Sequence, residues 1–171
     1  MTERSELDDS RTVLMHRLLK LTNRLMAPFT THLASRHQIS MNEFRMLMTL
    51  GRFGDKASHE LAVHTGVNAM SVSRAVAALE RNNRIKVSVD PANRRRKTLS
   101  LTAEGRRLYA MMRPEADRVA EYLLSQLSGS DMAALERIVD TLIATLEETD
   151  ETGRQLLMER TRPASDGEDA A

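Results

Sequence analysis

Four consecutive cations, reading Arg-Arg-Arg-Lys at residues 94–97, are the side chains whose type and spacing most clearly indicate a chemistry. Guanidinium and ammonium groups bind phosphate oxygens, and a thin basic loop can enter the narrow, electronegative minor groove of duplex DNA. Apolar residues alternate on both sides of the run, over residues 85–89 and 99–101. That pattern predicts two antiparallel strands with the cations in the loop between them.

A second group of candidate contacts lies upstream, where residues 60–79 have the pattern of a helix, a sharp turn and a second helix. A helix fits the major groove and can present side chains to base edges. The candidates for contacts to bases, thymine methyls or phosphates are Asn68, Met70, Ser71, Ser73 and Arg74. A hydroxyl on the helix surface explains Ser73 equally well. Arg84 and Lys86 are interpreted as solvated strand residues.

The sequence contains no catalytic constellation. It has no Ser–His–Asp order, no glycine-rich phosphate loop and no paired-carboxylate spacing. The pairs His32/His37 and His59/His64 are each five residues apart, so neither pair shares one helical face, and a metal site is a minor hypothesis. We expect no enzyme, no metal and no cofactor.

Composition narrows the class of protein. With 171 residues, seven glycines, four prolines and three per cent aromatics, the chain is predicted to form one compact, mainly α-helical unit. It has no cysteine and no signal-peptide pattern, which favours a cytoplasmic location. No apolar run approaches the roughly 20 residues that span a bilayer, so no membrane partner is expected.

Charge is distributed unevenly along the chain, although the net charge is only +1. Residues 55–105 hold nine Lys or Arg against five acids, whereas residues 131–171 hold four Arg against eleven acids. A basic middle suits a protein whose centre faces an anion.

The elements that position the basic residues can be outlined from periodicity. Residues 1–10 lack it and are expected to form a loosely ordered tail. From Thr12, apolar residues recur every three or four positions up to residue 33, which predicts one long helix with a kink at Pro28. Ser40 and Glu43 have the spacing of a capping box, which predicts a helix over residues 41–52.

The next helix is expected over residues 58–65, with Gly66 in the turn and Asn68 capping the helix that follows. Val72, Val76 and Leu79 form the buried stripe of that helix, and Ala62 allows the two helices to cross closely. Asn83 is a candidate for a left-handed conformation before the first strand.

The C-terminal part is predicted to be helical. A helix begins at Thr102, with Glu104 in its first turn and a bend at Pro114. Five apolar residues then step by three and four from Met132 to Leu146, as in a heptad seam. Residues 149–171 are expected to form an acidic, mobile tail.

Taken together, these motifs resemble the multiple antibiotic resistance regulator (MarR) family of winged helix-turn-helix transcription factors, over about residues 12–148. The family usually carries Asp-x-Arg in the wing and Leu-Thr-x-x-Gly after it. Asn93-Arg94-Arg95 and Leu101-Thr102-Ala103-Glu104-Gly105 stand at those places. The resemblance implies that Arg95 reaches the minor groove, and we expect Arg94, Arg96 and Lys97 to contact phosphate.

The chain departs from the family pattern at three positions. Asn93 replaces the usual Asp, which reduces an expected carboxylate–arginine bridge to a neutral hydrogen bond. Asn83 replaces the usual Gly before the wing, and Ala57 stands where a Ser or Thr cap is common. None of these departures removes the surface that would face DNA.

The resemblance also implies an organisation. It implies an obligate homodimer formed by residues 11–37 and 103–148 around a winged DNA-binding lobe at 38–102. The apolar seam over residues 132–146 favours the same conclusion, although it could instead pack within one chain. A two-fold protein can meet adjacent major grooves about 10 base pairs apart, so a pseudo-palindromic site in double-stranded DNA is expected.

Many family members bind small aromatic or phenolic compounds in a crevice near the dimer helices. The resemblance places five residues near such a crevice: Met15, His16, Phe44, Arg45 and Met48. Methionines adapt to varied ligands, and His16 or Arg45 could pair with an anion. Methionine at helical spacing is more often part of a core.

The sequence therefore predicts a DNA-binding transcriptional regulator, released from its operator by an aromatic or anionic effector. The alternative is a helical interaction module whose winged domain contacts protein. A small enzyme is the weakest of the three hypotheses.

Overall fold

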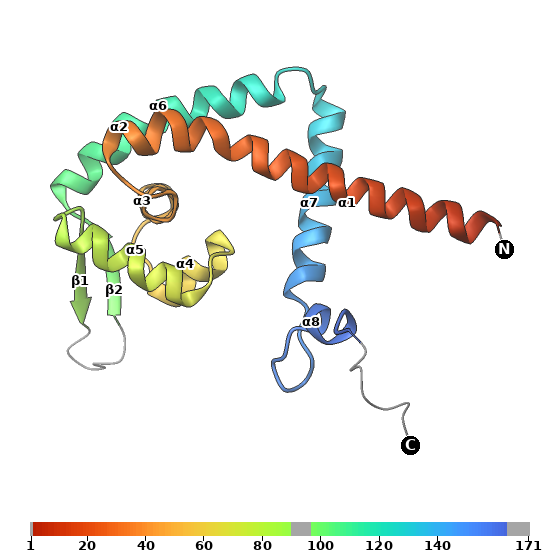
Figure 1. Ribbon diagram of the computed structural model, residues 1–171. Helices are drawn as coiled ribbons and strands as arrows, with labels where there is room; N and C mark the ends of the chain where they lie inside the picture. The colour runs from red at the N-terminus through yellow and green to blue at the C-terminus, as the bar shows by residue number, and fades with distance from the viewer. Residues whose placement is uncertain (1, 90–96, 164–171) are drawn as a thin grey trace. The chain divides into compact units, whose positions relative to one another are not determined.

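The computed structural model describes residues 2–89 and 97–163, with the backbone alone described at residues 2–8, 33 and 34. Helices dominate, as predicted, and one two-stranded sheet accompanies them (Figure 1). In chain order the elements are α1 (Thr2–Pro28), the π-helical η1 (Phe29–Ala34), α2 (Ser35–His37), α3 (Met41–Phe53), α4 (Ser58–Thr65), α5 (Ala69–Arg81), β1 (Ile85–Val89), β2 (Lys97–Leu101), α6 (Ala103–Leu124), α7 (Gly129–Glu147) and α8 (Leu156–Arg160).

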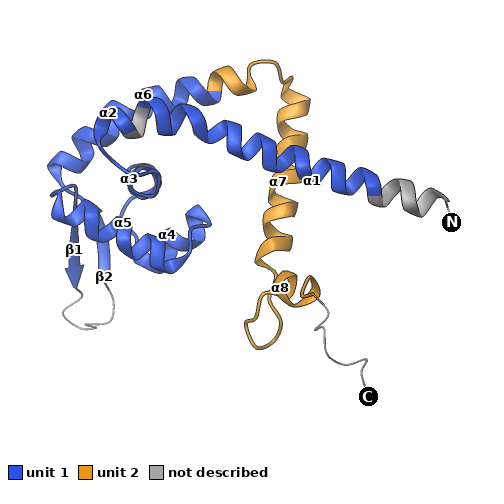
Figure 2. Ribbon diagram, viewed as in Figure 1, with its two compact units in different colours: residues 1–120 blue, residues 121–171 orange. Residues whose placement is uncertain are grey.

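The chain divides into two compact units, residues 1–120 and residues 121–171 (Figure 2). The first unit contains the winged helix-turn-helix and the second contains α7 and α8. No helix among the described residues combines the length and the apolarity that crossing a membrane requires.

The first unit is built around one apolar core. The core takes buried residues from α3, α4, α5, both strands and the start of α6, and Met46, Leu47, Leu61, Leu79 and Met112 have no exposed surface. The predicted stripe of α5 is confirmed, because Val72, Val76 and Leu79 are all buried. Burial of this stripe fixes which face of α5 remains in contact with solvent.

α3 begins where the sequence predicts. The backbone N–H of Glu43 donates to Ser40 Oγ at 3.2 Å, and the backbone N–H of Ser40 donates to Glu43 Oε2 at 2.8 Å. This reciprocal pair satisfies two N–H groups that the first helical turn leaves without partners. Gly54 ends the helix at a φ of 77°, a conformation that favours glycine.

α4 also begins where predicted, but with only half of such a box. The backbone N–H of Ala57 donates to Glu60 Oε2 at 2.6 Å, whereas alanine offers no oxygen to the N–H of Glu60. The hydrogen bond from Ala57 holds the pKa of Glu60 below its usual range. Because an acid with a lowered pKa stabilises the fold in its ionised form, this contact is present at neutral pH and is lost as the pH falls through that lowered pKa.

We expect Ala57→Ser to stabilise the first unit by about 1 kcal/mol, because the serine hydroxyl would accept from the N–H of Glu60. The measurement is chemical denaturation followed by circular dichroism. Ala110→Ser adds the same hydroxyl at an exposed position within α6. It is expected to lower the free energy of unfolding by about 0.5 kcal/mol, because serine has a lower helix propensity than alanine. Equal effects of the two changes would contradict the capping argument.

The N-terminal helix differs from the prediction at two places. Residues 2–10, expected as a loosely ordered tail, instead continue α1. They contain no glycine or proline, and extending an existing helix costs little once it has nucleated. At Pro28, where a kink was expected, α1 gives way to the π-helical turn η1, because proline has no N–H to donate to the preceding turn. Thr30 Oγ1 donates to the carbonyls of Met26 and Ala27 at 3.1 and 3.0 Å.

The predicted acidic tail also differs in its first part. Residues 149–160 form a closed turn followed by α8, and Thr149 pairs with Gln155. Asp150 Oδ1 holds the turn by accepting from the backbone N–H groups of Thr152 and Arg154 at 2.7 and 2.9 Å, and Gly153 takes a φ of 82°. A single aspartate therefore orders a segment that its composition alone marked as mobile.

Candidate nucleic-acid interface

The turn between α4 and α5 fixes the direction of the candidate recognition helix. Gly66 has a φ of 64°, the left-handed conformation that the sequence predicts. Thr65 Oγ1 donates to the carbonyl of Leu61 at 2.6 Å. Asn68 Oδ1 accepts from the backbone N–H of Ser71 at 2.9 Å, which confirms Asn68 as the cap of α5. The sequence alone therefore located both ends of this turn.

The side of α5 opposite the core carries most of the predicted contact residues. Met70, Ser73 and Arg74 are exposed, Met70 to 66% of its surface, and Ser71 is half-buried. Arg74 Nη2 lies 3.4 Å from Met70 Sδ, so these two side chains form one surface. Asn68 is also exposed, but the side-chain oxygen that could accept from a ligand already caps the helix. Met70 is the one large apolar side chain of α5 that is exposed, since Val72, Val76 and Leu79 are buried.

The predicted wing is present as an antiparallel pair of strands. β1 and β2 are in register from Ile85 opposite Leu101 to Val89 opposite Lys97. Lys97 is exposed at the last pair of this ladder. Asn93 and the three arginines Arg94, Arg95 and Arg96 lie outside the described residues. The strands therefore establish where the cationic loop begins and ends.

A third segment extends this sheet. The backbone N–H of Lys56 donates to the carbonyl of Leu99 at 3.1 Å, and the N–H of Leu99 donates back at 2.8 Å. The loop between α3 and α4 is thereby attached to the edge of β2. Sequence reasoning missed this pairing, because one bridge leaves no alternating pattern.

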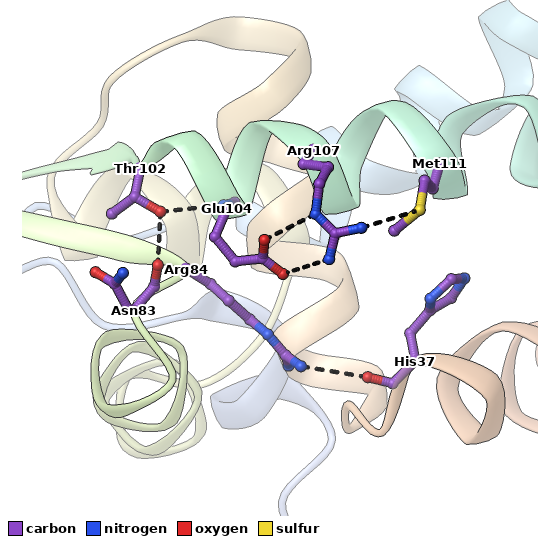
Figure 3. A network of polar contacts seen from close by, with 8 residues as sticks. His37, Asn83, Arg84, Thr102, Glu104, Arg107 and Met111 are labelled. Atoms are coloured by element: carbon purple, nitrogen blue, oxygen red, sulfur yellow. Dashed lines mark hydrogen bonds and ion pairs between the residues drawn. The ribbon is translucent and has the colours of Figure 1, made fainter.

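The Leu-Thr-x-x-Gly motif closes the base of the wing (Figure 3). Thr102 Oγ1 donates to the carbonyl of Asn83 at 2.6 Å and accepts from the N–H of Gly105 at 3.0 Å. The backbone N–H of Thr102 donates to the carbonyl of Arg84 at 3.1 Å. Asn83 has a φ of 53°, the predicted left-handed conformation. One threonine thus caps α6 and ties the start of β1 to the end of β2.

Gly105 is required at its position for a steric reason. A Cβ added there would overlap the carbonyl oxygen of Arg84 and would press on Leu101. The glycine lets the first turn of α6 lie directly against the backbone that enters β1. The family motif therefore corresponds here to a close contact between two backbone segments.

Arg84 is not the solvated strand residue that the sequence suggested. Its side chain is half-buried, and its Nη2 donates to the carbonyl of His37 at 3.3 Å (Figure 3). Arg84 Nη1 and His37 Nε2 are buried without a protein partner. The arginine therefore connects the base of the wing to the end of α2. Nothing in the sequence near Arg84 indicated a partner 47 positions away.

A charged pair lies in the first turn of α6. Arg107 Nε and Nη2 donate to the two carboxylate oxygens of Glu104 at 2.8 Å each. These hydrogen bonds hold the pKa of Glu104 below its usual range, and the carboxylate raises the pKa of Arg107. Glu104 therefore stays ionised near the positive end of the helix dipole at neutral pH.

The structure places the residues predicted for an effector crevice in different surroundings. Phe44 is buried, with its ring centroid 5.4 Å from that of Phe29, so it belongs to the core. Arg45 Nη1 donates to Asn42 Oδ1 at 3.3 Å, and its Nη2 lies 3.3 Å from Met26 Sδ. Met15 and His16 are exposed on α1.

Met48 does line an open pocket, of about 510 Å³. The pocket lies between α3 and α6, and its other side chains are Thr49, Arg52, Phe53, Tyr109, Arg113 and Asp117. It combines two aromatic rings with two arginines, of which Arg113 pairs with Asp117 at 3.5 Å. Tyr109 and Arg113 were missed from the sequence, because helical periodicity alone cannot show which side of α6 meets α3.

Comparisons with known proteins agree with this architecture. The MarR family model matches residues 39–97. The chain is 22% identical over 132 residues to the HTH-type transcriptional regulator YwaE of Bacillus subtilis, covering 75% of this chain and 77% of the relative.

Solved structures share the fold. Sco3205, a MarR family transcriptional regulator from Streptomyces coelicolor solved in complex with DNA, has a TM-score of 0.74 at 17% identity, covering 82% of this chain and 90% of that one. BpsR from Bordetella bronchiseptica, whose DNA binding is regulated by 6-hydroxynicotinic acid, has a TM-score of 0.66 at 22% identity. The match covers 75% of this chain and 97% of BpsR.

Proposed function

Because this chain belongs to the MarR family of winged helix-turn-helix transcriptional regulators through residues 39–97, we propose that it binds double-stranded DNA as a sequence-specific repressor. In this proposal Met70, Ser71, Ser73 and Arg74 of α5 face the major groove, and Asn68 orients the first turn of that helix. The wing residues Arg94, Arg95, Arg96 and Lys97 contact the minor groove and phosphates.

The exposed face of α5 is the observation that carries the proposal. Met70 and Arg74 touch each other and project from a helix whose opposite face is fixed in the core. Arginine is the commonest side chain in specific contacts with guanine, and methionine offers an apolar surface to a thymine methyl. The cationic loop follows this helix within one small lobe, so one surface can present both groups.

Exposed apolar residues support a homodimer. α7 has no buried residue, yet its seam residues Met132, Leu135, Val139, Leu142 and Leu146 are apolar. A contiguous apolar stripe exposed along a helix marks a surface that a partner covers. A second copy supplies that cover and also a second recognition helix, which suits an operator with two related half-sites.

A small-molecule effector is the third part of the proposal. The relative BpsR is regulated by 6-hydroxynicotinic acid, a planar aromatic acid, and the pocket between α3 and α6 combines aromatic rings with arginines. We therefore place the effector in this pocket, beside Met48, Tyr109 and Arg113. Met15, His16, Phe44 and Arg45 stay candidates from the sequence alone. A ligand that prefers one spacing of the recognition helices would shift the population away from the DNA-binding form. Because the relatives YwaE and BpsR are bacterial regulators, we also propose a cytoplasmic location.

The test is a titration of duplex DNA, with the promoter region beside the protein's own gene as the probe. For wild type, counterion release predicts a steep fall in affinity as salt increases. Arg74→Ala is expected to weaken specific binding about tenfold and to relax base preference at one position. Arg118→Ala removes the same charge from an exposed position of α6 outside the winged lobe and is expected to leave affinity within about twofold.

Two results would favour the interaction module over the DNA-binding regulator. One is the absence of duplex binding, and the other is binding that does not change with salt. Equal losses from Arg74→Ala and Arg118→Ala would show that α5 makes no specific contact.

A further inference from the structure

A second open pocket, of about 450 Å³, shares Gly51 and Tyr109 with the pocket beside Met48. The end of α3, the loop before α4, both wing strands and the start of α6 all contribute to it. Volumes of this size are typical of sites for small molecules. None of the five residues predicted for an effector crevice lines it.

The floor of this pocket is a row of three polar residues across the sheet. Ser100 pairs directly with Lys86, so their side chains leave the same face. On the side of β2 away from β1, Lys56 forms an antiparallel bridge with Leu99. Asp55, which precedes Lys56, therefore lies beside Ser100, which follows Leu99. Strands lie about 4.8 Å apart, so the backbones that carry Asp55 and Lys86 are separated by roughly 10 Å. An anion and a cation therefore stand at opposite ends of the row.

The wall of the pocket comes from α6 and from the end of α3. Arg106 Nη1 donates to the carbonyl of Leu101 at 2.7 Å, which fixes the orientation of its guanidinium group and leaves the remaining N–H groups available. The ring of Tyr109 packs directly on Gly51, where a Cβ would collide with it. Leu50 adds aliphatic surface. The wall is therefore cationic at one point and apolar along the rest.

The charges of the pocket do not neutralise one another. In the described part of the chain, no ion pair joins Asp55 to Lys86 or to Arg106. Two cations and one carboxylate remain around a partly apolar space. Such a set matches a molecule with a negative group at one end, a positive group at the other and a hydrophobic body between them.

We propose that this pocket binds a small zwitterion whose carboxylate pairs with Lys86 and Arg106 and whose ammonium group pairs with Asp55. The apolar body of the ligand lies on Tyr109 and Leu50, and the Ser100 hydroxyl offers a further hydrogen bond. This site adjoins the proposed effector pocket at Gly51 and Tyr109, but Met48 and Arg113 line only the effector pocket. The proposal does not depend on DNA binding.

The probe is 4-(aminomethyl)benzoate, which carries both charges across a rigid ring, and the readout is amide proton–nitrogen NMR of the full chain. We expect saturable shifts at Ser100 and Arg106 with a Kd on the order of 1 mM, as for a ligand of this size. Benzoate and benzylamine, which each lack one charge, are expected to bind at least about tenfold more weakly.

Three variants locate the ligand. Lys86→Gln and Asp55→Asn are each expected to weaken binding of the probe about tenfold, because each removes one charged partner. Arg113→Gln is the matched control, since it removes a cation from the neighbouring pocket alone, and it is expected to leave the Kd within about twofold. Unchanged NMR spectra elsewhere in each variant verify the fold.

Three outcomes would overturn the proposal. The first is the absence of saturable binding of the probe. The second is that benzoate or benzylamine binds as tightly as the probe. The third is that Arg113→Gln loses binding of the probe while Lys86→Gln keeps it. The last outcome would assign the probe to the effector pocket.

Discussion

Replacing Gly105 with alanine is expected to destabilise the first unit by about 3 kcal/mol, the upper part of the range for an overpacked site. The added methyl group would occupy the place of the Arg84 carbonyl oxygen. A backbone atom cannot move aside as a flexible side chain can, so either β1 or the first turn of α6 must shift. Urea denaturation followed by circular dichroism measures the loss.

Gly129 provides the matched control for this substitution. It is also a helical glycine, at the start of α7, and an added Cβ would meet nothing within 4 Å. Gly129→Ala is therefore expected to be neutral or slightly stabilising. Similar losses in the two variants would indicate a general effect of removing glycine and would contradict the steric argument.

The same variant has a functional consequence under the proposed function. The Thr102 hydroxyl bonds to both Asn83 and Gly105, so a displaced helix start also displaces the base of the wing. Duplex affinity of Gly105→Ala should therefore fall even at temperatures where the protein remains folded. Wild-type affinity in a folded Gly105→Ala variant would mean that the wing adjusts freely at its base.

Replacing Leu142 with glutamate is expected to separate the proposed homodimer into single chains. Leu142 lies in the apolar seam of α7 and is 43% exposed in the chain alone, so the change costs a single chain little. In a dimer, the charge would be taken out of water without a partner. Sedimentation velocity measures the change in mass.

Binding to a palindromic duplex should fall at least about a hundredfold in the same variant, because the second half-site no longer binds as part of one molecule. Ala144→Glu introduces the same charge on the side of α7 away from the seam, and it is expected to remain dimeric with nearly unchanged DNA affinity. A monomeric wild type, or a dimeric Leu142→Glu with unchanged affinity, would place the interface elsewhere.

The elements of the winged lobe could be predicted because their ends are marked locally. Ser40 with Glu43, Gly66 and Asn68 each act on neighbours within four residues, and the structure has them as capping groups or turns where expected. Alternation over residues 85–89 likewise predicted a strand with the observed bounds. Signals of this kind depend on backbone hydrogen bonding near the residue itself.

Contacts between distant segments could not be predicted in the same way. Arg84 meets His37, the ring of Tyr109 covers Gly51, and Lys56 pairs with Leu99, yet no local pattern marks any of these pairs. The pocket beside Met48 and the pocket beside Lys86 both depend on the approach of α3 to α6. For this reason, the buried and exposed faces of α5 could be assigned from the sequence, whereas the residues that line the pocket beside Met48 could not.

The absence of buried side chains in α7 has a thermodynamic consequence. Over the described part of residues 121–163 every side chain is exposed or half-buried, so this segment has no core of its own. Helices of such length owe most of their stability to what packs against them. If that packing comes from a second copy, mass action governs it, and the melting temperature of the segment rises with protein concentration. The cellular abundance of the protein would then set the fraction of molecules that are fully folded, as well as their number.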